Sequence, residues 1–141
     1  MDSDAITEMT GNEPWDFIAD RSFGRMALTI LGQPEIFPVN YSLVGRKLVF
    51  RTAEGTKLMG VLLDSHVAFE VDQVEADHAT SVVLKGTAHK IETQADLDKF
   101  DLSHLHSWVP TLKYNLVVID VKEITGRRFR FGPEPDLTPV M

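Results

Sequence analysis

The alternation of apolar and polar residues predicts a chain that consists mainly of strands. Segments rich in β-branched and aromatic residues are separated by short turns that contain glycine or proline, as at Gly32 and Gly45. These segments are residues 25–30, 35–43, 47–52, 66–72, 80–92, 115–125 and 127–131. Gly86 interrupts the longest segment, which predicts a bulge or a barrel corner. Strands of this length, joined mostly by short turns, predict a closed antiparallel barrel.

Helical patterns are short and lie beside the strands. Residues 12–24 begin with an asparagine cap and an early proline, carry aromatic residues and end at a glycine, so they predict an amphipathic helix. A second helix is expected at residues 56–64, and a helix or a pair of turns at residues 93–107. Residues 1–11 are expected to form a disordered tail, and the proline-rich residues 133–141 a flexible one.

Length and charge restrict the partners of the chain. The 141 residues suit a single domain, which we place at residues 12–132. The net charge of −7, from 21 acidic and 14 basic residues, repels nucleic acid and anionic membranes, so neither is expected as a partner. The first ten residues are acidic, and no apolar run reaches the roughly 20 residues of a membrane helix, so we expect a cytoplasmic protein.

The sequence offers no metal site and no evident acid–base pair. It contains no cysteine, which excludes disulfides, thiolate metal sites and a cysteine nucleophile. His104 and His106 are two residues apart, which points them to different faces of a helix, and no third ligand is spaced to join them. Catalytic residues are therefore unknown, and no metal is expected.

A cationic corner is expected where the third strand meets the helix that follows it. Arg51 and Thr52 end the strand, and Thr56 and Lys57 open the helix after a tight turn. A helix N-terminus carries a partial positive charge and unpaired N–H groups, so a lysine placed there favours a bound anion such as a phosphate dianion. The alternative is that both cations pair with nearby carboxylates on a solvated face.

Pro38 marks the second strand as unusual, because it removes a ladder donor within residues 36–41. Either this is an ordinary edge strand or bulge, or the strand faces a flat ligand in place of another strand. A planar heteroaromatic with alternating donors and acceptors would take main-chain hydrogen bonds there. Arg127 lies among Phe129 and Phe131, which suits either a side chain at the edge of the core or a ligand clamp.

The segments GRMALTI, PVNY, VFRTAEGTKL, VAFEVD, SVVLKG and ITGRRF, in this order and spacing, resemble the pyridoxamine 5'-phosphate oxidase-like flavin-binding split-barrel proteins. The similarity runs over residues 24–131. It implies a mainly β fold, a six-stranded antiparallel split barrel of Greek-key type with short flanking helices. It also implies a homodimer with two FMN sites at the subunit interface.

The resemblance also implies which residues contact the cofactor. The strand at residues 36–41 would lie along the isoalloxazine ring, the cationic corner would hold the phosphate, and two C-terminal residues would reach the flavin from the partner subunit. The implied cofactor-binding residues are Ile36, Phe37, Pro38, Val39, Asn40, Tyr41, Arg51, Thr52, Thr56, Lys57, Ser81, Trp108 and Arg127.

Two departures from the family pattern keep the activity open. Thr80 stands where many relatives carry tryptophan, and the C-terminal Arg-x-His element that binds pyridoxamine phosphate is missing, so that substrate is not expected. The main hypothesis is an FMN-dependent oxidoreductase that acts on a small molecule, with a nicotinamide as a possible donor. The alternatives are a reductase that uses the deazaflavin F420, and a non-catalytic module that binds flavin or has lost its cofactor.

Overall fold

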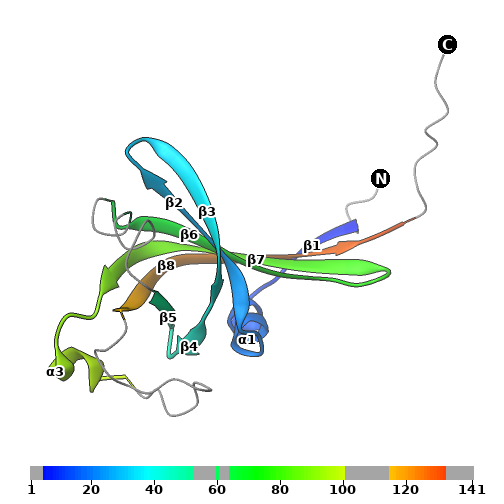
Figure 1. Ribbon diagram of the computed structural model, residues 1–141. Helices are drawn as coiled ribbons and strands as arrows, with labels where there is room; N and C mark the ends of the chain where they lie inside the picture. The colour runs from blue at the N-terminus through cyan, green and yellow to red at the C-terminus, as the bar shows by residue number, and fades with distance from the viewer. Residues whose placement is uncertain (1–4, 53–59, 61–63, 101–114, 133–141) are drawn as a thin grey trace.

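The structure is a computed structural model that describes residues 5–52, 60, 64–100 and 115–132, and it consists mainly of one curled antiparallel sheet (Figure 1). In chain order the elements are β1 (Ile6–Glu8), α1 (Glu13–Ala19), β2 (Phe23–Ile30), β3 (Gln33–Asn40), β4 (Ser42–Val44), β5 (Lys47–Thr52), β6 (His66–Val74), β7 (His78–Lys90), α3 (Gln94–Leu97) and β8 (Asn115–Arg130). Among these described residues, no helix is long and apolar enough to cross a membrane.

The order of the strands explains why the sheet curls. Along the hydrogen-bonded path the strands are β3-β2-β6-β7-β8-β5-β4, and β1 pairs with β8. β3 and β4 occupy opposite ends of this path, yet only Tyr41 separates them in the chain, so the two ends of the sheet must meet. The result is the half-barrel of a split-barrel fold, which confirms the predicted fold class.

The inner face of the sheet forms the core. β2 and β6 alternate between buried and more accessible residues with the period of two that a half-buried strand requires. The buried residues of the main cluster include Met26, Leu28, Phe50, Val67, Phe69, Val71, Val82 and Leu84. α1 covers one end of this core with Ile18, which is fully buried. The remaining positions of β2 and β6 form the outer face, on which the candidate site lies.

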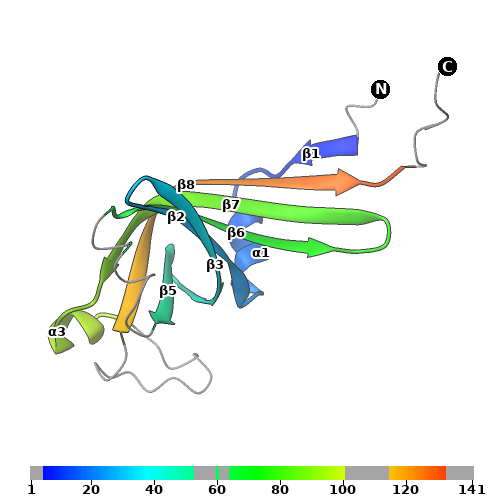
Figure 2. The same cartoon turned by 45° about the horizontal axis from the view of Figure 1, so that its top comes forward.

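One end of the sheet extends beyond the curled part as an arm, which Figure 2 shows from a second direction. The arm consists of β1 and the residues that lie beside it in register, which are residues 127–129 of β8, 79–81 of β7 and 72–74 of β6. A register shift between Lys85 and Gly86 confirms the predicted bulge.

Some expected boundaries need correction. The prediction of a disordered tail at residues 1–11 is wrong for residues 6–8, because β1 satisfies the otherwise unpaired edge of β8 in the arm. The first helix ends at Ala19, so residues 23–24 belong to β2. The strands expected on either side of Gly126 form the single strand β8. The helix expected at residues 56–64 lies almost entirely outside the described residues.

Candidate functional site

β3 is an edge strand whose turn fixes the direction of its main-chain groups. β2 and β3 are joined by Leu31 and Gly32, whose φ angles of 51° and 81° are the positive values that a type I′ turn requires. In such a two-residue loop the flanking pair, Ile30 and Gln33, is hydrogen-bonded, and bonded pairs then alternate with non-bonded pairs. The N–H of Tyr41 donates to the carbonyl of Ser22 at 2.8 Å, which fits the same alternation.

Every second residue of β3, beginning at Pro34, therefore turns its main-chain groups away from β2. These residues are Pro34, Ile36, Pro38 and Asn40. Because proline has no N–H, this edge offers carbonyl acceptors at each position but donors only at Ile36 and Asn40. Within the described part of the chain, no strand pairs along this edge. The prolines hinder the addition of another strand, and the remaining groups suit a planar ligand that both donates and accepts.

The side chains of β3 divide between the two faces. Ile36 is 65% exposed on the outer face, whereas Phe37 is half-buried and Val39 is buried in the core. The predicted contacts at Ile36, Pro38 and Asn40 are thus accessible, and Val39 would reach a ligand only through its main chain.

Tyr41 is part of the core. Its hydroxyl donates a 2.7 Å hydrogen bond to the carbonyl of Ile18, and its ring meets Phe69 edge to face at 5.3 Å. Burial raises the pKa of the Tyr41 hydroxyl, with a smaller opposing effect from Arg21. The side chain thus anchors α1 to the barrel, and a ligand contact at Tyr41 is left to its carbonyl.

The first half of the predicted phosphate corner lies at the end of β5. Arg51 is exposed and Thr52 is buried, opposite Leu116 and Asn115 on β8. The pairing of β4 with β5, continued beyond Ser42, brings the Arg51 end of β5 near the Asn40 end of β3, and β3 and β5 are in contact. The predicted residues Thr56 and Lys57, and also Trp108, lie outside the described residues.

Ser81 belongs to an ionic network on the outer face that the sequence did not predict. Its hydroxyl donates a 3.0 Å hydrogen bond to Glu70, which pairs with Arg25 on the neighbouring strand. The guanidinium of Arg25 also lies 2.7 Å from the carboxylate of Asp72. Outward positions carry these charges in both β2 and β6, but only the register brings them together. That alternation of charged with apolar residues was the available signal.

The network raises the pKa values of Arg25 and Glu70 for different reasons. Glu70 raises the pKa of Arg25, because the pairing favours the guanidinium ion. Burial raises the pKa of Glu70, and sharing a hydrogen bond with Asp72 adds to this, so together they outweigh the attraction of Arg25. Glu70 therefore gains a proton more readily than a carboxyl group in water.

Arg127 lies opposite Ser81 on the arm, far from the edge of β3. It is exposed and forms no ion pair with any residue that the structure describes. Three strand spacings separate β3 from β7 along the sheet, which is about 14 Å. One subunit therefore does not place Ser81 and Arg127 beside β3.

No group of three potential metal ligands occurs among the described residues.

Comparisons with known proteins place this geometry in a family. The sequence profile described as pyridoxamine 5'-phosphate oxidase matches residues 10–128. The uncharacterized protein Rv3129 of Mycobacterium tuberculosis is 44% identical over 92 residues, which are 65% of this chain and 84% of that protein.

Two solved structures share both fold and sequence with the chain. An FAD binding protein from Mycobacterium smegmatis has a TM-score of 0.75 and 35% identity, covering 89% of this chain and all of that one (100%). A putative pyridoxamine 5'-phosphate oxidase from Corynebacterium glutamicum has a TM-score of 0.77 and 35% identity, covering 95% of this chain and 99% of the other.

Proposed function

The chain belongs to the pyridoxamine 5'-phosphate oxidase family, and on this premise we propose that it is a homodimeric, flavin-dependent oxidoreductase acting on a small organic molecule. The flavin would be FMN or FAD, which share the isoalloxazine ring and the first phosphate. The similarity to a protein described as FAD binding supports a flavin without distinguishing the two.

The observation that carries this proposal is the edge of β3. Its outward main-chain groups alternate donors at Ile36 and Asn40 with proline positions that have only an acceptor. The pyrimidine part of an isoalloxazine ring presents donors and acceptors in one plane, so it can take hydrogen bonds from such an edge. The exposed side chain of Ile36 gives this ring an apolar surface nearby.

The end of β5 supports a phosphate site beside this edge. Arg51 is exposed near the Asn40 end of β3, and the buried Thr52 follows it in the chain. A charge-assisted hydrogen bond from a guanidinium is among the strongest that a phosphate receives. We propose that Thr56 and Lys57 complete this group.

The distance between β3 and the arm supports a dimer. Along the sheet, Ser81 on β7 lies about 14 Å and Arg127 on β8 about 19 Å from the β3 of their own subunit, so they would reach a flavin only if a second copy placed its arm there. Arg127 has no ion-pair partner among the described residues, so its charge is available for such a role. We propose that Arg127 and Trp108 contact the cofactor of the partner subunit.

A bound flavin would supply the two-electron chemistry, since the described residues contain no evident acid–base pair for a reaction of their own. The residues of the chain would hold the ring through β3, fix the phosphate through Arg51 and limit access of water to the ring. A reduced nicotinamide is the proposed electron donor.

Titration of the purified protein with FMN, FAD and F420 tests this function. We expect tight binding of a flavin and weaker binding of F420, because the long anionic tail of F420 meets a chain of net charge −7. Ile36→Pro should weaken flavin binding about threefold to tenfold by removing one outward donor, and Ile36→Ala, which keeps the donor, is its matched control. Proline already occupies equivalent positions, so the strand tolerates it.

Arg51→Ala tests the phosphate contact, and it should weaken FMN binding by about tenfold or more. Absence of flavin binding at high micromolar concentration would contradict the proposal and favour a barrel that acts through protein contacts. Binding without any turnover of reduced nicotinamides or small oxidants would favour a flavin-binding module.

A further inference from the structure

A groove on the outer face arises from two small residues that lie opposite each other. Across the sheet, Ile36, Ala27, Ala68, Lys85 and Glu123 occupy one row on β3, β2, β6, β7 and β8. The two alanines stand at the centre of this row, and neither fills the space above the strands.

Larger side chains border the alanines on both sides. The ion pair of Arg25 and Glu70 occupies the next row on one side, and Thr29 and His66 lie on the other. The alanines therefore form the floor of a hollow between taller walls.

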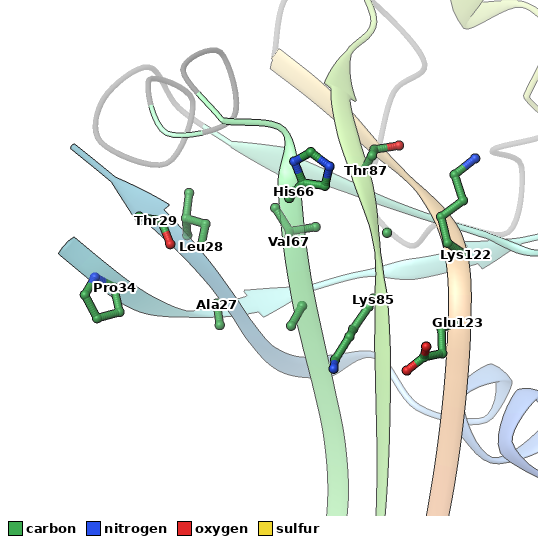
Figure 3. A pocket seen from close by; sticks show the side chains of 12 residues that line it. Ala27, Leu28, Thr29, Pro34, His66, Val67, Lys85, Thr87, Lys122 and Glu123 are labelled. Carbon is green, nitrogen blue, oxygen red and sulfur yellow. The ribbon is translucent and has the colours of Figure 1, made fainter. Parts of the chain in front are cut away.

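The size and lining of this hollow suit a small molecule. Its volume is about 660 Å³, within the roughly 300–1,000 Å³ of ligand pockets. Figure 3 shows Pro34 and Thr29 at one side, and Lys85 and Glu123 on the strands opposite. Most of its surface is apolar, and its polar side chains are those of Thr29, His66, Lys85, Thr87, Lys122 and Glu123.

The rim of the groove carries cations that are available to a ligand. The bulge leaves Lys122 without a cross-strand partner, so that Lys122 and Glu123 both line the groove. Neither Lys85 nor Lys122 forms an ion pair with a described residue. Figure 3 shows Lys85 extending from β7 towards β6, and Lys122 extending from β8 in the opposite direction, so the two cations lie at different parts of the rim.

We propose that this groove binds a compact organic anion, with an aromatic or aliphatic body on the alanine floor and a carboxylate or similar group paired with Lys85 or with Lys122 at the rim. The mainly apolar lining excludes a small inorganic ion as the matching ligand, and the two lysines outnumber the single carboxylate of Glu123. Lys85 and Lys122 are not among the residues proposed to hold the flavin. The inference therefore stands or fails separately from the proposed function.

Two fluorescent probes of similar shape test the groove. 1-Anilinonaphthalene-8-sulfonate carries the anionic group, and N-phenyl-1-naphthylamine lacks it. We expect the full-length protein to bind both, and the anion more tightly. The double variant Lys85→Ala, Lys122→Ala should weaken binding of the sulfonate about tenfold or more and leave the neutral probe unchanged. The matched control is Lys99→Ala, at an exposed lysine that pairs with Asp96 at 3.1 Å.

A second variant tests the floor without relying on charge. Ala68→Phe fills the hollow on the outer face and should abolish binding of both probes, while near-ultraviolet circular dichroism confirms an intact fold. Unchanged affinity for both probes in Ala68→Phe would overturn the proposal, as would equal loss of both probes in the lysine variant. The proposal would also be overturned if the wild-type protein is a dimer that binds neither probe and Ala68→Phe converts it to a monomer in sedimentation experiments. A second copy of the chain would then fill the groove.

Discussion

Ser81 on β7 donates a 3.0 Å hydrogen bond to the carboxylate of Glu70 on β6, so a residue predicted to contact flavin is also part of an ion-pair network. Glu70 joins three strands, because it also pairs with Arg25 on β2. Its partly buried position raises its pKa above the ordinary value, and Ser81 acts in the opposite direction by stabilising the carboxylate. The network thus links the protonation of Glu70 to the position of Ser81.

Glu70→Gln should change how stability depends on pH. An acid with a raised pKa in the folded protein holds its proton more tightly there than in the unfolded chain. The stability that this pKa difference provides is complete below pH 4.5, which is the pKa of the side chain in the unfolded chain. It is lost as the pH rises through the raised pKa of the folded protein. The free energy of unfolding of the wild type, relative to Glu70→Gln, should therefore increase as the pH falls from 7 to 4.5.

Urea unfolding at several pH values measures this difference. Ser81→Ala serves as a second variant, since loss of its hydrogen bond should raise the pKa of Glu70 further and extend the effect to higher pH. The difference in the free energy of unfolding between the wild type and Glu70→Gln could instead stay constant, or grow as the pH rises. Either result would show that burial is not the main influence on the pKa of Glu70.

Tyr41→Phe should destabilise the protein by about 0.5–1.5 kcal/mol. The change removes the hydroxyl that donates to the carbonyl of Ile18, which then keeps the 3.2 Å hydrogen bond from the N–H of Arg21. The edge-to-face contact with Phe69 remains, so Tyr41→Leu should cost more. Chemical denaturation measures both. Because the side chain lies in the core, Tyr41→Phe should leave flavin affinity unchanged, and a large loss of affinity would place the hydroxyl at the ligand instead.

The sequence predicted the elements whose signals are local. The turn at Gly32 separates β2 from β3, Gly86 marks the bulge, and Pro38 marks an edge strand. Each of these depends on a residue and its immediate neighbours, so no knowledge of the pairing was needed.

The features that the sequence did not reveal depend on register. Arg25 and Glu70 are 45 positions apart, and nothing in either segment shows that they face each other. The same holds for the paired alanines that form the groove floor, and for β1, whose three residues are too few to show a period. The role of Tyr41 in the core was hidden because it follows a strand of accessible residues.

Leu31→Asn should stabilise the protein by about 0.5–1 kcal/mol. Leu31 has a φ of 51°, in the left-handed region that costs an ordinary residue about 1–2 kcal/mol and that asparagine tolerates better. The substitution also creates an Asn-Gly pair, which favours the type I′ turn between β2 and β3. Thermal and urea unfolding measure the gain.

The control for this turn is Leu31→Ala, which removes the 84% exposed apolar side chain and keeps the conformational cost. It should not stabilise the protein. An equal gain from both substitutions would mean that the exposed side chain, and not the backbone, is the source of the effect.

Gly86→Ala should destabilise the protein by about 2–3 kcal/mol, because a Cβ at this position would lie 2.0 Å from the carbonyl oxygen of Asp120. The obstacle is main chain and not a flexible side chain, so β8 would have to move away from β7 at the bulge. This movement would displace Lys122 and Glu123, which line the groove. Gly132→Ala is the matched control, since no atom lies within 4 Å of its added Cβ. Denaturation of the two variants checks the cost, and an equally small effect of both would show that the bulge relaxes freely.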